Sequence, residues 1–285
     1  MTVRETLDYI RVRLREAGIE EFEYESWVFL EWIFGIRRAD YYMDPGEKVD
    51  SEKEELLEKM LAKRCERVPL QYLMGDCEFM GYPFLVDERV LIPRQDTECL
   101  VEKALEHLKA WHLTSLRRPE ILDLCTGSGC IGISIKKLFP EASVTLADIS
   151  EGALEVARKN AEELQTEVTL IQGNLFENIK DNFDFIISNP PYIPTKVIEG
   201  LMPEVRDHEP HLALDGAEDG LLFYRKIVRE SVSHLKEGGM LLFEIGQEQG
   251  ADLREMMEKE GFSQIEIWKD LAGLDRIVIG RRLFR

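Results

Sequence analysis

The sequence lacks several features that mark other classes of protein. No stretch of about 18 apolar residues occurs, and the first residues lack the apolar core of a signal peptide. The five cysteines are odd in number and form no C-x-x-C pair, which argues against a disulfide framework and a zinc site. These absences favour a cytoplasmic protein with no membrane span and no metal site.

Positive charge is outnumbered by negative charge. The chain has 36 Lys and Arg residues against 55 Asp and Glu, which gives a formal net charge of −19. Such a charge disfavours a broad electrostatic grip on a nucleic-acid backbone, whereas a small ligand or a basic protein partner is compatible with it. We therefore expect no direct binding of nucleic acid.

Two nucleotide-binding signatures are missing from the glycine-bearing segment Asp123-Leu124-Cys125-Thr126-Gly127-Ser128-Gly129. It has no Gly-Lys-Ser/Thr, so it is not a phosphate-binding P-loop, and Cys125 stands where the dinucleotide pattern needs its first glycine. The segment nevertheless joins an apolar strand to an apolar helix. A glycine-bearing turn at a helix N-terminus lets a ligand, in particular an anionic group, approach the backbone closely.

The pattern of apolar residues divides the chain into three regions. Residues 1–73 show helical spacing, as in Leu7, Ile10 and Leu14, and predict a small helical bundle. Residues 74–92 predict a β-hairpin linker, because Phe79, Tyr82 and Phe84 surround a Gly-Tyr-Pro turn. Residues 93–285 form the third region, which begins with a helix from residue 97.

The third region alternates between strands and helices. Apolar runs predict strands at 121–124, 143–147, 168–171, 183–188 and 240–245, followed by two closely spaced strands near 265–267 and 276–279. Such alternation predicts an α/β fold, a doubly wound and mostly parallel sheet with helices on both faces. The last two strands have no helix between them, which indicates an antiparallel end to the sheet.

The tetrapeptide Asn189-Pro190-Pro191-Tyr192 follows the strand at 183–188. Two prolines fix the backbone, and the residue before a proline is held extended, so the turn is rigid and presents one amide side chain. The Asn189 oxygen and the Pro190 carbonyl can each accept an N–H from a planar amino group, while Tyr192 covers its face. An ordinary Pro-Pro loop is the alternative interpretation.

Ligand-type residues follow the other strands as well. Asp148 ends the second strand and can accept both hydroxyls of a ribose, and Ser150 is the better cap of the next helix. Asn174 follows the third strand and can bind an adenine edge, with Leu175 against its face or in the core. Because parallel strands end at one edge of the sheet, we expect a single site there.

The region from about residue 93 resembles the class I S-adenosylmethionine-dependent methyltransferases, and the whole chain resembles the HemK/PrmC family of release factor N5-glutamine methyltransferases. The resemblance lies in Leu91-Ile92-Pro93-Arg94-Gln95-Asp96-Thr97-Glu98, Asp123 to Gly129, and Asn189 to Tyr192, with support from Glu209-Pro210, Ala213-Leu214, Asp219-Gly220-Leu221 and Glu244-Ile245-Gly246. Gln95 replaces a proline that is usual in the family, and Cys125 replaces the usual first glycine of the loop.

The resemblance implies a seven-stranded sheet, S-adenosylmethionine as cofactor and release factors as protein partners recognised by the helical region. It implies cofactor-binding roles for Asp123, Cys125, Thr126, Gly127, Ser128, Gly129, Asp148, Asn174, Leu175 and Asn189. It implies catalytic roles for Asn189, Pro190 and Tyr192, with Pro191 and Arg94 also at the substrate. Arg94 and Glu98 are four residues apart, so we expect an ion pair that positions the hairpin or is merely a surface salt bridge.

Two other functions remain open. Adenine also presents a planar amino group, so the same tetrapeptide would serve a nucleic-acid N6-adenine methyltransferase after base flipping; an enzyme acting on ribosomal RNA or a ribosomal protein is a related alternative. A non-catalytic cofactor-binding scaffold is the third. The net charge of −19 argues against the nucleic-acid enzyme, and the intact Asn189, Gly127 and Gly129 argue against the scaffold.

Overall fold

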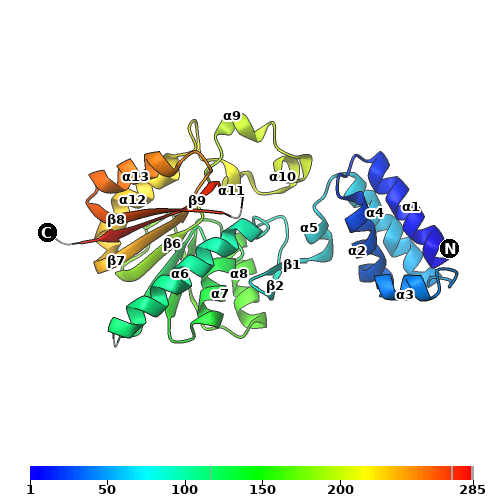
Figure 1. Cartoon of the computed structure of the whole chain (residues 1–285), viewed down its shortest axis with the longest axis horizontal. Coiled ribbons are helices and arrows are strands. Elements are labelled where there is room, and N and C mark those ends of the chain that lie inside the picture. Colours follow the sequence, from blue (N-terminus) through cyan, green and yellow to red (C-terminus); the bar gives the residue numbers. More distant parts are fainter. Residues whose placement is uncertain (116, 271, 284–285) are drawn as a thin grey trace. The chain divides into compact units, whose positions relative to one another are not determined.

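The computed structural model describes residues 1–115, 117–270 and 272–283 and separates the chain into two compact units (Figure 1). The helical unit contains Met1–Gly75 and Met202–His208. The sheet unit contains Asp76–Leu201 and Glu209–Arg285. The sequence predicted one continuous region from residue 93 onward, but a short segment of that region packs with the N-terminal helices instead.

The helical unit is built around the apolar stripes that its sequence predicted. Its helices are α1 (Val3–Glu16), α2 (Phe22–Phe34), α3 (Arg38–Met43), η1 (Ser51–Lys53), α4 (Glu54–Cys65), α5 (Leu70–Met74) and α10 (Pro203–His208). Thr2 and Glu5 form a capping box at the start of α1, which satisfies backbone N–H groups that lack helical partners. Ile10, Phe29 and Leu61 lie in the buried core between the helices.

Helix α10 is held in the helical unit by buried ion pairs. The carboxylate of Glu204 accepts hydrogen bonds from Arg64 at 2.9 Å and from Arg67 at 2.7 Å. Arg64 also donates two hydrogen bonds to Glu25, and its side chain is only 4% exposed. The segment therefore joins this unit through charge rather than through an apolar stripe, which is why hydrophobic periodicity does not predict it.

The sheet unit contains a seven-stranded sheet in the order β5-β4-β3-β6-β7-β9-β8. The strands are β3 (Glu120–Leu124), β4 (Ser143–Asp148), β5 (Thr169–Gln172), β6 (Phe183–Ser188), β7 (Leu235–Glu244), β8 (Phe262–Lys269) and β9 (Asp275–Arg282). Strands β3 to β7 are parallel, and β9 is antiparallel to both β7 and β8. The predicted α/β fold with an antiparallel end is confirmed.

Helices cover both faces of this sheet (Figure 1). One face buries α6 (Gln95–Thr114), α7 (Cys130–Leu138) and α8 (Glu151–Glu163), and the other buries α12 (Leu222–His234) and α13 (Gly250–Lys259). Neighbouring residues alternate between the faces: Ile121 packs in the first core and Leu122 in the second. The remaining short helices are α9 (Thr195–Ile198) and α11 (His211–Leu214).

Strand order reverses beside β3, which lies between β4 and β6. The chain passes from β3 to β4 and β5 in one direction, and then returns to place β6 on the opposite side of β3. In doubly wound sheets, ligands bind outside the carboxyl ends of the strands at such a switch point. The structure thereby brings the ends of β3, β4 and β6 together.

The β-hairpin consists of β1 (Asp76–Phe79) and β2 (Tyr82–Leu85). Its turn residues Met80 and Gly81 both have positive φ, of 51° and 76°, as a tight hairpin turn requires. Glu98 of α6 accepts the Met80 N–H at 2.6 Å. Asn160 of α8 accepts the Leu85 N–H at 2.6 Å and donates to the Leu85 carbonyl at 3.0 Å, so two helices of the sheet unit hold the hairpin.

The predicted ion pair between Arg94 and Glu98 is wrong. Arg94 instead forms an ion pair with Glu209, and Glu98 acts as an acceptor for the hairpin backbone. Glu209 lies 115 residues away in sequence, so helical spacing could not reveal it. The tertiary contact replaces the local pair because Glu209 is almost fully buried and needs a cation.

None of the helices in residues 1–115, 117–270 and 272–283 combines the length and apolar character needed to cross a bilayer.

Candidate active site

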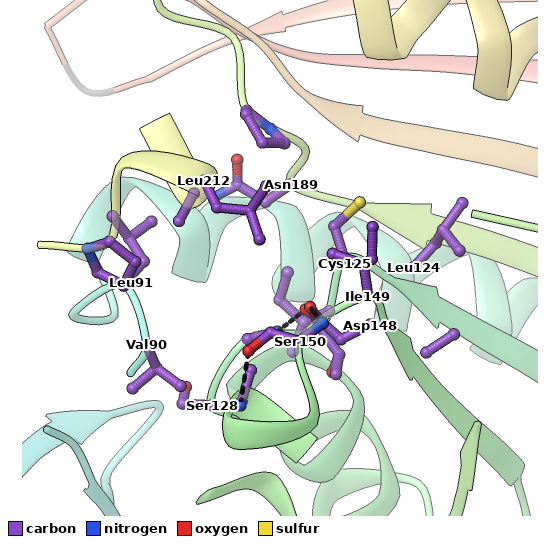
Figure 2. A pocket seen from close by; sticks show the side chains of 18 of the residues that line it. Val90, Leu91, Leu124, Cys125, Ser128, Asp148, Ile149, Ser150, Asn189 and Leu212 are labelled. Carbon is purple, nitrogen blue, oxygen red and sulfur yellow. Dashed lines mark hydrogen bonds between the residues drawn. The ribbon is translucent and has the colours of Figure 1, made fainter. Parts of the chain in front are cut away.

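A cavity of about 310 Å³ opens at the carboxyl ends of β3, β4 and β6 (Figure 2). That volume is at the lower end of the range for small-molecule sites in proteins. Predicted site residues that line it are Arg94, Cys125, Thr126, Gly127, Ser128, Asp148, Asn174, Leu175, Asn189 and Pro191. Asp123, Gly129, Pro190 and Tyr192 are not among the lining residues, and the contacts of Asp123 and Gly129 place these two behind the loop.

The loop after β3 is shaped by three residues with positive φ. They are Cys125 at 62°, Gly127 at 55° and Gly129 at 82°. A Cβ at Gly129 would lie 2.7 Å from Cδ1 of Ile133 and 3.2 Å from Cβ of Ala157, so the limited space and the positive φ together favour glycine there. A Cβ at Gly127 would meet no atom within 4 Å, which leaves its backbone accessible to a ligand. Cys125 adopts the left-handed conformation without being glycine.

Asp123 lies directly behind this loop. Its side chain is fully buried, and Oδ2 accepts hydrogen bonds from the Thr126 hydroxyl at 2.5 Å and from the Gly132 N–H at 2.9 Å. Burial raises the pKa of Asp123 to about 7, against the lowering effect of these two bonds. The carboxyl group thus connects the loop to the first turn of α7.

Asp148 stands across the loop at the end of β4. Its Oδ2 accepts the Gly127 N–H at 2.9 Å, and its Oδ1 accepts the Ser150 N–H at 2.9 Å. Burial raises the pKa of Asp148, and the backbone hydrogen bonds oppose that effect. Ser150, which lies beside Asp148 in Figure 2, accepts the Ala153 N–H and caps α8, so each Asp148 oxygen keeps a lone pair for a ligand.

Asn174 and Leu175 form the end of the cavity beyond β5. Leu175 has a positive φ of 54° and is 7% exposed, and it belongs to the core under α12 as well as to the cavity wall. The backbone N–H of Asn174 donates to Glu177 at 3.3 Å. Leu175 therefore belongs both to the core and to the cavity wall, and its place against the face of an adenine stays a prediction.

The Asn189 side chain faces the cavity from the end of β6 (Figure 2). Its Nδ2 donates to the hydroxyl oxygen of Thr97 at 3.3 Å. Thr97 is 3% exposed and lies in the first turn of α6. This contact uses one of the two N–H groups of Nδ2 and leaves the carbonyl oxygen of the Asn189 side chain available to a ligand.

The backbone of the tetrapeptide is enclosed by residues far along the chain. Cβ atoms at Gly216 and Gly220 would lie 2.8 Å from Cα of Tyr192 and 2.3 Å from its carbonyl oxygen, respectively. Gln249 donates to the same carbonyl at 3.1 Å. The sequence analysis did not identify Gly216 or Gln249 as supporting residues. It included Gly220 only as part of the segment Asp219-Gly220-Leu221.

The Tyr192 side chain extends toward β7. Its hydroxyl donates to Oε1 of Glu244 at 3.3 Å, and burial raises the pKa of the tyrosine. Glu244 is 2% exposed; burial raises its pKa, while the Thr97 hydroxyl and Arg276 lower it. No ion pair to Glu244 occurs in the described part of the chain. Its Oε2 also lacks a partner of standard hydrogen-bond geometry there.

Arg94 lines the cavity on the side of α6. It donates to Oε1 of Glu209, whose side chain is 1% exposed, while the Arg94 side chain is 39% exposed. Burial raises the pKa of Glu209, and Arg94 lowers it. One nitrogen of the Arg94 guanidinium therefore binds the buried Glu209 carboxylate, and the remaining guanidinium nitrogens are accessible from the cavity.

No cluster of three or more histidine, cysteine, aspartate or glutamate side chains suited to a metal ion occurs within residues 1–115, 117–270 and 272–283. The expectation that the protein has no metal site stays a prediction.

Comparisons with solved structures support the fold. The chain overlays a methyltransferase from Pyrococcus furiosus with a TM-score of 0.52 at 20% identity, covering 72% of this chain and 91% of that one. It overlays a T. thermophilus 16S rRNA methyltransferase, solved in complex with AdoMet and guanosine, with a TM-score of 0.52 at 15% identity. That second match covers 73% of this chain and 49% of the other. At these identities the likeness concerns the fold alone.

Sequence relatives are much closer. Residues 5–75 match the family description "PrmC N-terminal domain", and residues 101–203 match "Methyltransferase small domain". The chain is 41% identical over 281 residues to the release factor glutamine methyltransferase of Geobacter sulfurreducens, covering 98% of this chain and 96% of the relative. It is 36% identical over 289 residues to that of Clostridium acetobutylicum, covering 99% of both. The chain therefore belongs to the release factor glutamine methyltransferase family.

Proposed function

We propose that the protein transfers a methyl group from S-adenosylmethionine to the side-chain amide nitrogen, N5, of a glutamine in a peptide-chain release factor. The observation that carries the proposal is the Asn189 side chain, which faces the cavity while its Nδ2 is engaged by Thr97. The Asn189 side-chain oxygen, held beside two prolines, can accept a hydrogen bond from the planar side-chain amide of a glutamine. Family membership directs the proposal to glutamine rather than to adenine.

The cavity fits S-adenosylmethionine by the chemistry of its lining. Asp148 would accept the ribose hydroxyls, the open backbone at Gly127 would admit the methionine part, and Asn174 and Leu175 would contact the adenine. Thr126, Ser128 and Cys125 complete the loop, and Asp123 and Gly129 hold it from behind. When bound, the cofactor supplies a methyl group made electrophilic by the neighbouring sulfonium.

The residues after β6 would bind and orient the substrate amide. Its nitrogen is a poor nucleophile because its lone pair is delocalised into the carbonyl. The Asn189 oxygen and the Pro190 carbonyl would each accept one N–H, and this aims the nitrogen along the line of attack. Alignment of this kind can account for about 7–11 kcal/mol of a barrier. The two acceptors also stabilise the positive charge that develops on nitrogen.

Other parts of the tetrapeptide would complete the amide site. Pro191 lines the cavity, and Tyr192 would pack on the amide while its hydroxyl is anchored to Glu244. Arg94, partly exposed at the cavity, would contact the backbone or side chains around the glutamine. After transfer the nitrogen carries one proton too many, and this proton leaves to solvent. A dedicated general base is not required.

The helical unit would recognise the release factor. This assignment rests on the match of residues 5–75 to the PrmC N-terminal domain. The net charge of −19 supports a protein partner over a nucleic acid. A substrate that works in translation termination also supports the cytoplasmic location that the sequence predicts.

The test is transfer of labelled methyl from S-adenosylmethionine to three candidates. They are a bacterial release factor, the same factor with its candidate glutamine changed to asparagine, and duplex DNA. Label on the unchanged factor alone supports the proposal. Label on DNA would favour the adenine enzyme, and cofactor binding without transfer to any candidate would favour the scaffold.

Substitution of Asn189 tests the residue that carries the proposal. We expect Asn189→Ala to lower kcat by about 10²–10³-fold, because a hydrogen-bond partner of the reacting group is lost. Cofactor affinity by calorimetry should stay within about threefold. Asn182→Ala is the matched control, since Asn182 is exposed and away from the cavity. Equal loss of transfer and cofactor binding in Asn189→Ala would contradict the assignment.

A further inference from the structure

Glu209 is a buried carboxylate beside the cavity. Its side chain is 1% exposed, Oε1 accepts a hydrogen bond from Nη2 of Arg94, and Oε2 has no partner of standard hydrogen-bond geometry among the described residues. A buried ion pair adds little to stability on average, because the desolvation of both charges offsets their attraction. What such a contact can provide is a fixed direction for the planar guanidinium.

Arg94 and Arg89 both line the cavity, but they differ in how many of their nitrogens are engaged. Arg89 donates from Nε and Nη2 to Asp87 at 2.8 and 2.5 Å, and from Nη1 to Glu155 at 2.7 Å. Among the described residues, Arg94 uses Nη2 alone, on Glu209, and its side chain is 39% exposed. The Nε and Nη1 donors of Arg94 are therefore available to a ligand, whereas Arg89 is held by carboxylates of the protein.

The position of Arg94 places these donors near the part of the cavity that Asn189 faces. Arg94 directly precedes α6, and its backbone carbonyl accepts the Thr97 N–H at 3.1 Å. The Thr97 hydroxyl in turn accepts the Asn189 Nδ2–H at 3.3 Å. Arg94 thus lies three residues before the side chain that contacts Asn189, the residue proposed to bind the target amide.

A second connection runs from Glu209 to the tetrapeptide. Three residues of the following segment, 210–216, line the cavity, and Figure 2 labels one of them, Leu212. Further along this segment, the Leu214 carbonyl accepts the Ile193 N–H at 3.0 Å. Because Ile193 directly follows the tetrapeptide, Glu209 is tied to the turn that carries the substrate acceptors, and so is the arginine that Glu209 binds.

The available donors of Arg94 determine the kind of group that can bind there. A guanidinium presents N–H donors only, so it binds oxygen acceptors and repels the ammonium and sulfonium groups of the cofactor. A glutamine within a polypeptide is flanked by peptide carbonyls, which are acceptors of this kind. The methionine carboxylate of the cofactor is the other such acceptor, and measurements of cofactor affinity separate the two.

We infer that Glu209 is a positioning residue, which fixes the Arg94 guanidinium so that its available N–H groups bind peptide carbonyls beside the target glutamine. The inference deepens the proposed function and rests on it. Glu209 does not line the cavity, so it acts through Arg94 rather than on the substrate. The contact requires only an acceptor oxygen at the position of Oε1, which a carboxylate and a neutral amide both supply.

The central comparison is between two replacements of Glu209 in the full-length protein. Glu209→Leu removes the acceptor, and we expect KM for the release factor to rise about tenfold while kcat stays within about threefold. Glu209→Gln keeps an acceptor oxygen, so its KM should stay within about threefold of the unchanged value. Cofactor affinity by calorimetry should change by less than about twofold in both variants. Glu155→Leu is the matched control and should leave KM unchanged, because Arg89 keeps Asp87 as a partner.

A double-mutant cycle tests the link between Glu209 and Arg94. Arg94→Met removes the donors, and we expect KM for the release factor to rise about 30-fold. Adding Glu209→Leu to Arg94→Met should change KM by less than about twofold, because no guanidinium remains to be positioned. Independent effects would instead multiply to about 300-fold and would contradict the link. The double variant leaves neither charge unpaired, so it replaces Arg94→Met if that variant does not fold.

The outcomes separate this inference from the proposed function. If the unchanged protein labels no release factor, the proposed function fails and the inference falls with it. If it does label the factor, an unchanged KM in Glu209→Leu, or equal increases in Glu209→Leu and Glu209→Gln, overturns the inference. A cofactor affinity that falls as much as KM rises also overturns it, because Arg94 would then bind the methionine carboxylate.

A second variant decides if Glu209→Leu fails to fold. Arg94→Lys keeps the charge that pairs with Glu209 but lacks the further nitrogens of the guanidinium. A rise in KM of about tenfold at unchanged cofactor affinity would support the inference. An unchanged KM for the release factor would overturn it.

Discussion

The helical unit and the sheet unit both bury charged side chains, but only the helical unit pairs them fully. In the helical unit Arg64 lies between Glu25 and Glu204, with Arg67 completing the group. Each carboxylate has a cation within 3 Å, and each bond has good geometry. Such a group fixes one arrangement of the chain, here the attachment of α10 to the N-terminal helices.

Three carboxylates behind and beside the cavity of the sheet unit are satisfied differently. Asp123, Asp148 and Glu244 have no ion-pair partner within the described ranges, and burial raises the pKa of each. Hydrogen bonds from backbone N–H groups and hydroxyls hold them instead. A carboxylate held this way keeps lone pairs for a ligand or for orienting a neighbour, which a full ion pair would occupy.

The largest effect on stability should come from breaking the paired group. Arg64→Met would leave Glu25 and Glu204 buried without their shared cation, and we expect a loss of about 3–5 kcal/mol in the free energy of unfolding. Lys63→Met, an exposed neighbour on the same helix, should change it by less than about 0.5 kcal/mol. Urea denaturation followed by far-UV circular dichroism measures both. Similar small losses in the two variants would show that the ion pairs do not stabilise the unit.

The sequence predicted most of the fold because the strands and helices of the sheet unit carry clear periodic patterns. It also predicted that residues after β3, β4, β5 and β6 meet, because parallel strands share an edge. It could not predict the partner of Arg94, since spacing along a helix favoured Glu98 and the true partner is distant in sequence. The sequence also could not predict that α10 belongs to the helical unit. Ion pairs attach this helix, and they produce no periodic pattern of apolar residues.

Individual roles at the site depended on contacts between elements. Thr97 was visible as part of a motif, but its contact with Asn189 depends on how α6 packs against the end of β6. The backbone conformation of Cys125 could not be predicted for a similar reason. Its positive φ of 62° follows from the tight turn over Asp123, which sequence pattern alone does not describe.

The second largest effect should be a pH dependence of stability caused by Asp123, which has hydrogen bonds but no ion-pair partner among the described residues. Its folded pKa of about 7 exceeds the unfolded value of 3.8, so its contribution to stability is full below pH 3.8 and is lost as pH rises through 7. Asp123→Asn has similar size and no titration. We expect the stability of the unchanged protein relative to Asp123→Asn to fall by roughly 2–3 kcal/mol between pH 5 and pH 7. Urea denaturation at pH 5, 6 and 7 would show it, and parallel pH profiles would contradict the raised pKa.

The smallest of these effects should be on cofactor affinity. It concerns whether Asp148 accepts hydrogen bonds from the ligand or only holds the loop after β3. Asp148→Ala removes two acceptors from the cavity, and we expect cofactor affinity to fall about 10–30-fold by calorimetry, equal to about 1.4–2 kcal/mol. Asp181→Ala, an exposed aspartate of the sheet unit, should leave affinity unchanged. Because Asp148 also binds the Gly127 and Ser150 N–H groups, loss of affinity alone would not show contact with the ribose.

A cofactor product analogue with a ribose that lacks both hydroxyls resolves the two roles of Asp148. If the carboxylate binds the ribose, the unchanged protein should bind this analogue about 10–30-fold more weakly than S-adenosylhomocysteine, and Asp148→Ala should bind the two almost equally. If the carboxylate only anchors the loop, removing the hydroxyls would weaken both proteins by the same factor. The second result would place Asp148 with the paired charges of the helical unit, as a group that fixes structure, and would limit the contrast between the units to Asp123 and Glu244.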